Sequence, residues 1–279
     1  MKRFTYTSEI DQWPITAYRW PLTGSLATVV ISHGLAEHAK RYDRLAQLLN
    51  VSGFNVYAMD HRAHGETSGP AGLGDFGDGG WDALIDDIDQ LIDICRRDSP
   101  DTPVFLLGHS MGAAAAQQLV QRSSEKLLGL VMSGTTLRNS GEEIPEYNAG
   151  FEPVRTPYDW LSRDQAEVDR YISDPLCGFE GQNIRNGMDR TDPRRVDRGR
   201  LRMIRGDLPV LLIAGDEDSV NDQLRGIDYL ESCWREAGIK NIDRQIYVGG
   251  RHEMFNETNR DEVCENMIVW LKKIVSDEA

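Results

Sequence analysis

Short, nearly continuous apolar runs recur along this 279-residue chain, and amphipathic stretches separate them. Runs of this kind are typical of strands buried on both faces, because the crossovers that join parallel strands cover the sheet. The alternation therefore predicts an α/β fold, with a mostly parallel central sheet and helices on both faces. The predicted strands are residues 26–32, 54–60, 103–108, 128–134, 209–215 and 244–250.

The stretches between these runs carry apolar residues at helical spacing. The first part of the chain, residues 4–20, instead alternates apolar and polar residues around a turn. This pattern predicts an antiparallel hairpin at the edge of the sheet. Helices are predicted over residues 41–53, 81–97, 110–124, 221–238 and 260–275.

The alternation lapses between residues 137 and 205, where short pieces rich in proline, arginine and aromatic residues replace it. Because strand-like runs flank this segment on both sides, we interpret it as an insertion and not as a linker. The expected organisation is a core of residues 1–136 and 206–279, with residues 137–205 forming a cap.

Composition excludes several classes of partner. The net charge of −14 disfavours general binding to nucleic acid or to anionic membranes, since both select basic surfaces. No apolar run approaches the ~20 residues that span a bilayer, and no apolar signal-peptide core follows the basic start. The four cysteines lie far apart without a Cys-x-x-Cys pair, which is typical of reduced thiols. A cytoplasmic protein without a structural metal is expected.

The segment Gly108-His109-Ser110-Met111-Gly112 follows one predicted strand and precedes a predicted helix. This context is what a nucleophile elbow requires, because the glycines permit a tight turn that leaves the hydroxyl exposed at the sheet edge. The helix N-terminus beneath it favours developing negative charge. A serine that merely caps the helix is the structural alternative. The strand–turn–helix context favours the nucleophile.

A serine nucleophile on this type of sheet is followed along the chain first by an acid and then by a histidine. Of the six histidines, His252 alone follows Ser110, and it lies just past the last predicted strand. It is therefore the candidate base.

The acid is expected on the loop after the preceding strand, which reads GDEDSVND. Asp218 is favoured because it lies far enough past the strand to turn inward. Asp216 suits a turn-stabilising backbone bond, and Asp222 suits the first turn of the following helix. A neighbouring acid on this loop remains the alternative.

Two backbone N–H groups are needed to stabilise the oxyanion of an acyl-transfer reaction. Met111, which follows the nucleophile, supplies one, and Leu35, in the loop after the first core strand, supplies the other. The cluster of Asp60, His61 and His64 allows a metal-site interpretation, but its spacing favours turn capping and packing.

Five segments together resemble the monoacylglycerol lipase and lysophospholipase branch of the α/β-hydrolases, of the serine aminopeptidase S33 type: HGLAEHAKRY, DHRAHGETSG, GHSMGA, GDEDSV and GGRHEMFNE. The resemblance covers nearly the whole chain outside part of the insertion. It implies the α/β-hydrolase fold and the same site: Ser110, Asp218 and His252 as the triad, with Leu35 and Met111 as the oxyanion hole.

The resemblance also implies that apolar residues of the cap line an acyl pocket. The candidates are Phe151, Tyr158, Trp160, Leu161, Leu176 and Phe179. Two departures predict a shallower pocket than in long-chain lipases. The segment 135–155 is short, and residues 185–205 are polar, with eight arginines. These arginines either face the mouth and favour a substrate with an anionic distal group, or form a solvated cap surface.

The sequence thus predicts a serine hydrolase that cleaves small-molecule carboxylic esters through an acyl-enzyme, with no cofactor and no metal. Monoacylglycerol-like, lysophospholipid-like and shorter acyl esters are the expected substrates. An amidase or peptidase with the same triad is the first alternative. A non-catalytic, ligand-binding homologue is the second.

Overall fold

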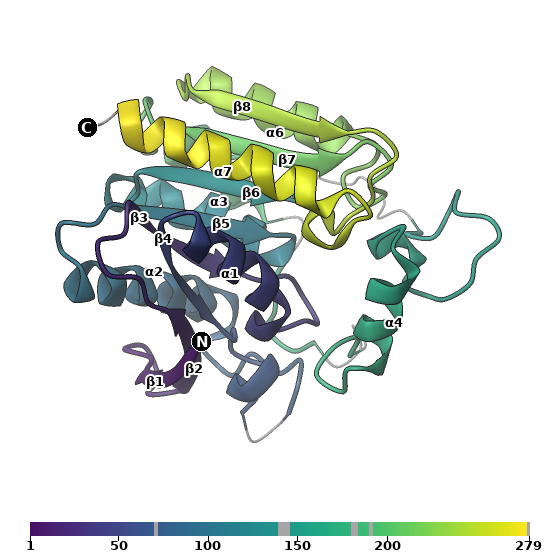
Figure 1. Cartoon of the computed structure of the whole chain (residues 1–279), viewed down its shortest axis with the longest axis horizontal. Helices are drawn as coiled ribbons and strands as arrows, with labels where there is room; N and C mark the ends of the chain where they lie inside the picture. Colours follow the sequence, from purple (N-terminus) through teal and green to yellow (C-terminus); the bar gives the residue numbers. More distant parts are fainter. Residues whose placement is uncertain (70–71, 139–145, 180–183, 190–191, 278–279) are drawn as a thin grey trace.

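The structure is a computed structural model, and it describes residues 1–69, 72–138, 146–179, 184–189 and 192–277. Within these residues, eight strands form one sheet in the order β1-β2-β4-β3-β5-β6-β7-β8 (Figure 1). The strands are β1 (Lys2–Thr7), β2 (Pro14–Trp20), β3 (Ala27–Ser32), β4 (Phe54–Met59), β5 (Val104–His109), β6 (Gly129–Ser133), β7 (Val210–Gly215) and β8 (Ile242–Tyr247).

The strand pairings confirm the mostly parallel sheet. Strands β1 and β2 form the predicted antiparallel hairpin at one edge, and β2 also pairs antiparallel with β4. The pairs from β4 through β3, β5, β6 and β7 to β8 are all parallel. The last strand begins two residues earlier than predicted and ends at Tyr247, because the glycines that follow form a turn.

Each central strand faces two separate apolar cores, which explains the continuous apolar runs. In β3, Val30 packs into one core, while Val29 and Ile31 pack into the other. Leu106 of β5 likewise faces the first core, and Phe105 faces the second. Successive side chains of a strand point to opposite faces, so a sheet covered on both sides needs an apolar residue at every position.

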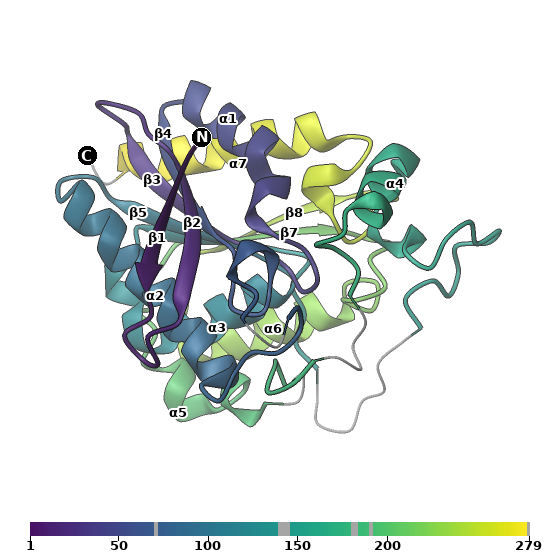
Figure 2. The same cartoon turned by 90° about the horizontal axis from the view of Figure 1, so that it is seen from below.

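Helices cover both faces of the sheet (Figures 1 and 2). Helices α1 (Asp43–Val51) and α7 (Arg260–Asp277) pack on one face. Helices α2 (Gly80–Asp98), α3 (Met111–Ser123) and α6 (Arg225–Ala237) pack on the other. Helix α6 begins four residues later than predicted, because Asp222 and the next two residues have positive φ angles. Asp222 therefore precedes the helix, and its predicted place in the first helical turn is wrong.

The chain between β6 and β7 contains helices α4 (Gln165–Ser173) and α5 (Arg198–Leu201). Helix α4 lies beyond the carboxyl ends of the parallel strands (Figure 2). The division into a core of residues 1–136 and 206–279 and a cap of residues 137–205 stays a prediction, and parts of that cap lie outside the described residues. No helix in the described ranges is long and apolar enough to cross a membrane.

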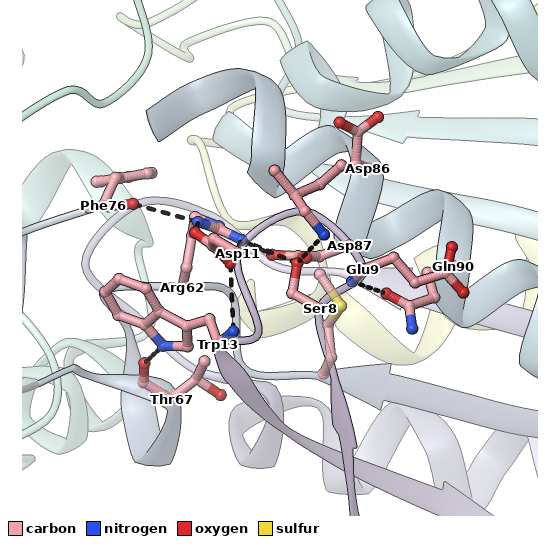
Figure 3. Close-up of polar contacts among 12 residues, drawn as sticks. Ser8, Glu9, Asp11, Trp13, Arg62, Thr67, Phe76, Asp86, Asp87 and Gln90 are labelled. Carbon is pink, nitrogen blue, oxygen red and sulfur yellow. Dashed lines mark hydrogen bonds and ion pairs between the residues drawn. The ribbon is translucent and has the colours of Figure 1, made fainter. Parts of the chain in front are cut away.

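Arg62, in the loop after β4, ties three parts of the fold together (Figure 3). Its fully buried guanidinium pairs with Asp87 of α2 at 2.8 Å and with Asp11 of the hairpin turn at 2.8 Å. It also donates to the Ser8 hydroxyl and to the Phe76 carbonyl oxygen. Removing one partner of a buried pair leaves an uncompensated charge, so these bonds hold the loop after β4 against α2 and the hairpin turn.

Candidate active site

Ser110 lies at the turn between β5 and α3, with φ +52° and ψ −113°. Side-chain-bearing residues seldom adopt such a conformation, and it persists only where the surroundings enforce it. A Cβ atom at Gly108 would lie 2.6 Å from the carbonyl oxygen of Gly112. A Cβ atom at Gly112 would lie 2.1 Å from the carbonyl oxygen of Ser32 at the end of β3. Both glycines are therefore required for α3 to pack against β5 and β3.

The Ser110 backbone is anchored while its hydroxyl remains available. Its N–H donates to the Ser133 carbonyl oxygen at 2.9 Å, and its carbonyl oxygen accepts from the Ala114 N–H at 3.0 Å. The side chain makes no capping hydrogen bond to α3, so Ser110 is not the helix-capping serine considered as the alternative. Among the described residues, the hydroxyl makes no hydrogen bond. Catalytic hydrogen bonds are often long in the absence of substrate.

His252 and Asp218 form a buried pair. The Nδ1 atom of His252 lies 3.1 Å and 3.0 Å from the two carboxylate oxygens of Asp218. The carboxylate also accepts from the Val220 N–H at 2.8 Å and from the Asn221 side-chain amide at 3.2 Å. These bonds hold Asp218 as an acceptor, which orients the imidazole with Nδ1 toward the acid and Nε2 away from it.

The neighbouring acids have other partners. The carboxylate of Asp216 accepts from the Gly249 N–H at 2.6 Å, which joins the acid loop to the histidine loop. Asp222 pairs with Arg225 at 2.6 Å. Within the described ranges, Asp218 is thus the acid of this loop whose carboxylate contacts the imidazole of His252.

The electrostatic surroundings raise the pKa of His252. Burial of the ring by itself lowers the pKa. The charge of Asp218 and its hydrogen bond act in the opposite direction, assisted by the charges of Glu253 and Glu37, and together they outweigh burial. The protonated form of the His252 imidazole is therefore stabilised at this position.

Ser110 and His252 line one cavity of about 250 Å³. Leu35 and Met111, whose N–H groups are the predicted oxyanion donors, line it as well. Neither N–H has a hydrogen-bond partner among the described residues. A Cβ atom at Gly34 would lie 3.3 Å from the Ser110 Cβ, which shows how closely this loop approaches the elbow.

Four of the six predicted pocket residues line the cavity, namely Tyr158, Trp160, Leu161 and Phe179. The short turn that carries Trp160 and Leu161 is fixed to the histidine loop, because the Glu253 N–H donates to the Leu161 carbonyl oxygen at 2.8 Å. The other two predicted residues do not line this cavity. The guanidinium carbon of Arg251 lies over the Phe151 ring, 4.1 Å from the ring centroid. The Leu176 N–H donates to the Asp174 carboxylate in the turn that follows Asp174.

An ion-pair network next to the cavity was not predicted from the sequence. Arg41 pairs at 2.7 Å with both Glu37 and Glu253, and Glu37 also accepts from the Gly34 N–H at 2.5 Å. The network joins the Leu35 loop to the residue after His252. The four-residue spacing of Glu37 and Arg41 could have indicated their ion pair, whereas nothing in the sequence indicated that Glu253 joins it.

Besides His38, which contacts Asp174, four more histidines are buried around this loop: His33, His61, His64 and His109. The rings of His33 and His61 lie 4.1 Å apart, and each bonds to protein groups. Burial lowers the pKa of His33 and His64 to about 3 and that of His109 to about 4, and it also lowers that of His61. These imidazoles are neutral packing groups.

The buried histidines make the protein sensitive to mild acid. Below pH 6.5 the unfolded chain binds protons on these four residues, whereas the native state does not until the pH approaches their lowered pKa values. The free energy of unfolding should fall by about 1 kcal/mol per histidine for each pH unit below 6.5. Denaturant titrations at pH 7 and pH 5.5 measure it. Asp87, whose pKa is raised to about 6 by burial, and His252 act in the opposite direction. An unchanged unfolding free energy would contradict the assignment of neutral rings.

Comparisons with known proteins agree with this geometry. Residues 24–259 match the family described as "Serine aminopeptidase, S33". The chain is 30% identical to the monoglyceride lipase of Mus musculus over 256 residues, covering 85% of this chain and 79% of that protein. It is 28% identical to a monoacylglycerol lipase of Mycolicibacterium smegmatis, covering 90% of each. A carboxyl esterase from Bacillus coagulans superposes with a TM-score of 0.86 at 25% identity, covering 98% of both chains.

Proposed function

The chain belongs to the serine aminopeptidase S33 family of α/β-hydrolases and is a carboxylic ester hydrolase, and we propose that it works through Ser110, Asp218 and His252. The observation that carries this proposal is the placement of Ser110, on a strained turn, in one cavity with the His252–Asp218 pair. Fold alone does not assign a reaction, and this constellation of groups supports acyl transfer.

The proposed reaction proceeds through an acyl-enzyme. His252 removes the proton from the Ser110 hydroxyl as its oxygen attacks the ester carbonyl carbon, and Asp218 stabilises the resulting imidazolium. The Leu35 and Met111 N–H groups bind the oxyanion. The intermediate collapses as His252 protonates the leaving alcohol. Water, activated by the same imidazole, then hydrolyses the acyl-enzyme and releases the carboxylic acid.

The size of the cavity supports esters of short to medium acyl chains. Its volume of about 250 Å³ lies below the range of roughly 300–1,000 Å³ that is typical of small-molecule pockets. The relatives named above are monoglyceride lipases and an esterase. We infer that this chain takes monoacylglycerol-like or simpler esters whose acyl group fits the cavity.

The acyl-chain dependence tests this inference. Each buried methylene contributes about 0.8 kcal/mol, so kcat/KM should rise roughly four-fold per added methylene until the cavity is full. We expect the rise to stop at short-to-medium chains. Initial rates with 4-nitrophenyl esters from acetate to palmitate measure the profile. A maximum at palmitate would contradict the shallow pocket.

An aminopeptidase is the alternative that the family description raises. Such an enzyme needs an acidic group to bind the substrate ammonium, and Glu37 and Glu253 both line the cavity. Both carboxylates are already paired with Arg41, which favours the esterase. Comparing kcat/KM for an ester with that for its matched amide separates the two activities. Failure to react with a fluorophosphonate probe would instead support the non-catalytic alternative.

A further inference from the structure

Arg195 brings a positive charge into the cavity wall. Arg195 is the last residue of the short helical turn Pro193–Arg195, and only 3% of its surface is exposed. It lines the same cavity as Ser110, together with the apolar side chains of Ala114 and Met188. Its guanidinium contacts Gln117, which lies seven residues after Ser110 on α3. Seven residues of helix rise about 10 Å, so Gln117, which holds the guanidinium, is separated from the Ser110 turn by about two helical turns.

The partners of this guanidinium are all neutral. Its Nε and Nη2 atoms donate to the Gln117 side-chain oxygen at 3.1 Å and 2.9 Å, and Nη2 also donates to the Thr136 carbonyl oxygen. No carboxylate lies within 4 Å of it in the described ranges, and its Nη1 group has no hydrogen-bond partner there. The nearby carboxylate of Asp192 has other partners: it pairs with Arg194 at 2.7 Å and accepts a hydrogen bond from the Gln118 side chain at 3.0 Å.

A buried charge is costly unless an opposite charge accompanies it. Burial lowers the pKa of Arg195 to about 10, and the charge of Asp192 compensates only in part. A second cation, Arg138, lines the same cavity. The carboxylates that line it, Glu37 and Glu253, are both paired with Arg41. Arg195 is therefore a buried cation in the wall of this cavity, and its hydrogen-bond partners among the described residues, Gln117 and Thr136, are neutral.

We propose that Arg195 binds a carboxylate carried at the far end of the substrate, so that the enzyme prefers esters with an anionic end, such as half-esters of dicarboxylic acids. This inference rests on the proposed esterase function and specifies its substrate class. The two Nη1 N–H groups donate to the carboxylate, while the apolar wall contacts the methylenes between it and the ester. Hydrogen bonds between charged groups are stronger than those between neutral groups, so losing them should produce a measurable fall in kcat/KM.

The test compares two matched series. The mono-4-nitrophenyl esters of succinate, adipate and suberate carry the free carboxylate, and their methyl-capped counterparts are neutral. For the best-fitting length, the wild-type enzyme should prefer the acid by roughly ten-fold or more in kcat/KM. Arg195→Met should abolish this preference, measured as the ratio of kcat/KM for the acid to kcat/KM for the neutral ester in the same variant. Arg198→Met, which removes an exposed arginine paired with Glu236, should preserve it.

Two outcomes would overturn the inference: a wild-type enzyme without preference for the acids, or an Arg195→Met enzyme with the same preference. If Arg195→Met does not fold, inhibition of wild-type turnover of a neutral ester decides instead. Suberate should inhibit at least ten-fold better than its dimethyl ester, and equal inhibition would reject the site. Because turnover of neutral esters is measured throughout, a failure of the esterase proposal is distinguished from a failure of this one.

Discussion

Replacing Ser110 with alanine should lower kcat for ester hydrolysis by a factor of ~10³ or more. The substitution removes the oxygen that would form the acyl-enzyme, and the remaining groups can only assist attack by water. The fold should be retained, because alanine keeps the Cβ atom and the hydroxyl makes no hydrogen bond to the described residues. Initial rates with a 4-nitrophenyl ester and thermal unfolding of the same preparation measure both effects.

A control variant lies on the same helix. Ser123 ends α3, and its hydroxyl donates to Asp89, on the helix next to it. Ser123→Ala should keep its activity and its labelling by a fluorophosphonate probe, whereas Ser110→Ala should lose both. Retained turnover in a purified, folded Ser110→Ala protein would reject this serine as the nucleophile.

Replacing Asp218 with asparagine should lower kcat by a factor of about 10²–10⁴. An amide at this position can present its NH₂ group to Nδ1, which favours the wrong tautomer of His252, and it no longer stabilises the imidazolium. Asp216→Asn and Asp222→Asn are the matched controls, because these acids bond to Gly249 and Arg225. Their losses should be far smaller. A larger loss at Asp216 than at Asp218 would mean that the triad is misassigned.

The pH profile of the same variant gives a second measure. Asp218 supplies most of the attraction that raises the pKa of His252, and a histidine must be neutral to act as the base. In the wild-type enzyme the acidic limb of kcat/KM should therefore have its midpoint above pH 6.5. In Asp218→Asn, burial is less opposed and the midpoint should move to lower pH. A merely structural role of Asp218 would leave the midpoint unchanged.

Much of the fold was predictable from local sequence pattern. The apolar runs reflect strands that contact a core on each face, so the pattern of a few neighbouring residues is enough to identify them. The elbow was likewise recognisable from five consecutive residues, although the close contacts of Gly112 are made with Ser32 of β3, which is distant in the sequence. His252 was identified by its order in the chain, because it alone of the six histidines follows Ser110.

Only the tertiary structure shows which loop residues reach the site, because this depends on the direction in which their side chains point. Asp216, Asp218 and Asp222 are chemically alike, and only the folding of their loop against the histidine loop brings one of them to His252. The segment between β6 and β7 behaves in the same way: Trp160 reaches the cavity while Phe151 packs against Arg251, although both are aromatic residues of this segment. The charge of Arg195 was visible as part of an arginine-rich stretch. Its burial beside Gln117 was not, because contacts between residues 78 positions apart leave no local pattern in the sequence.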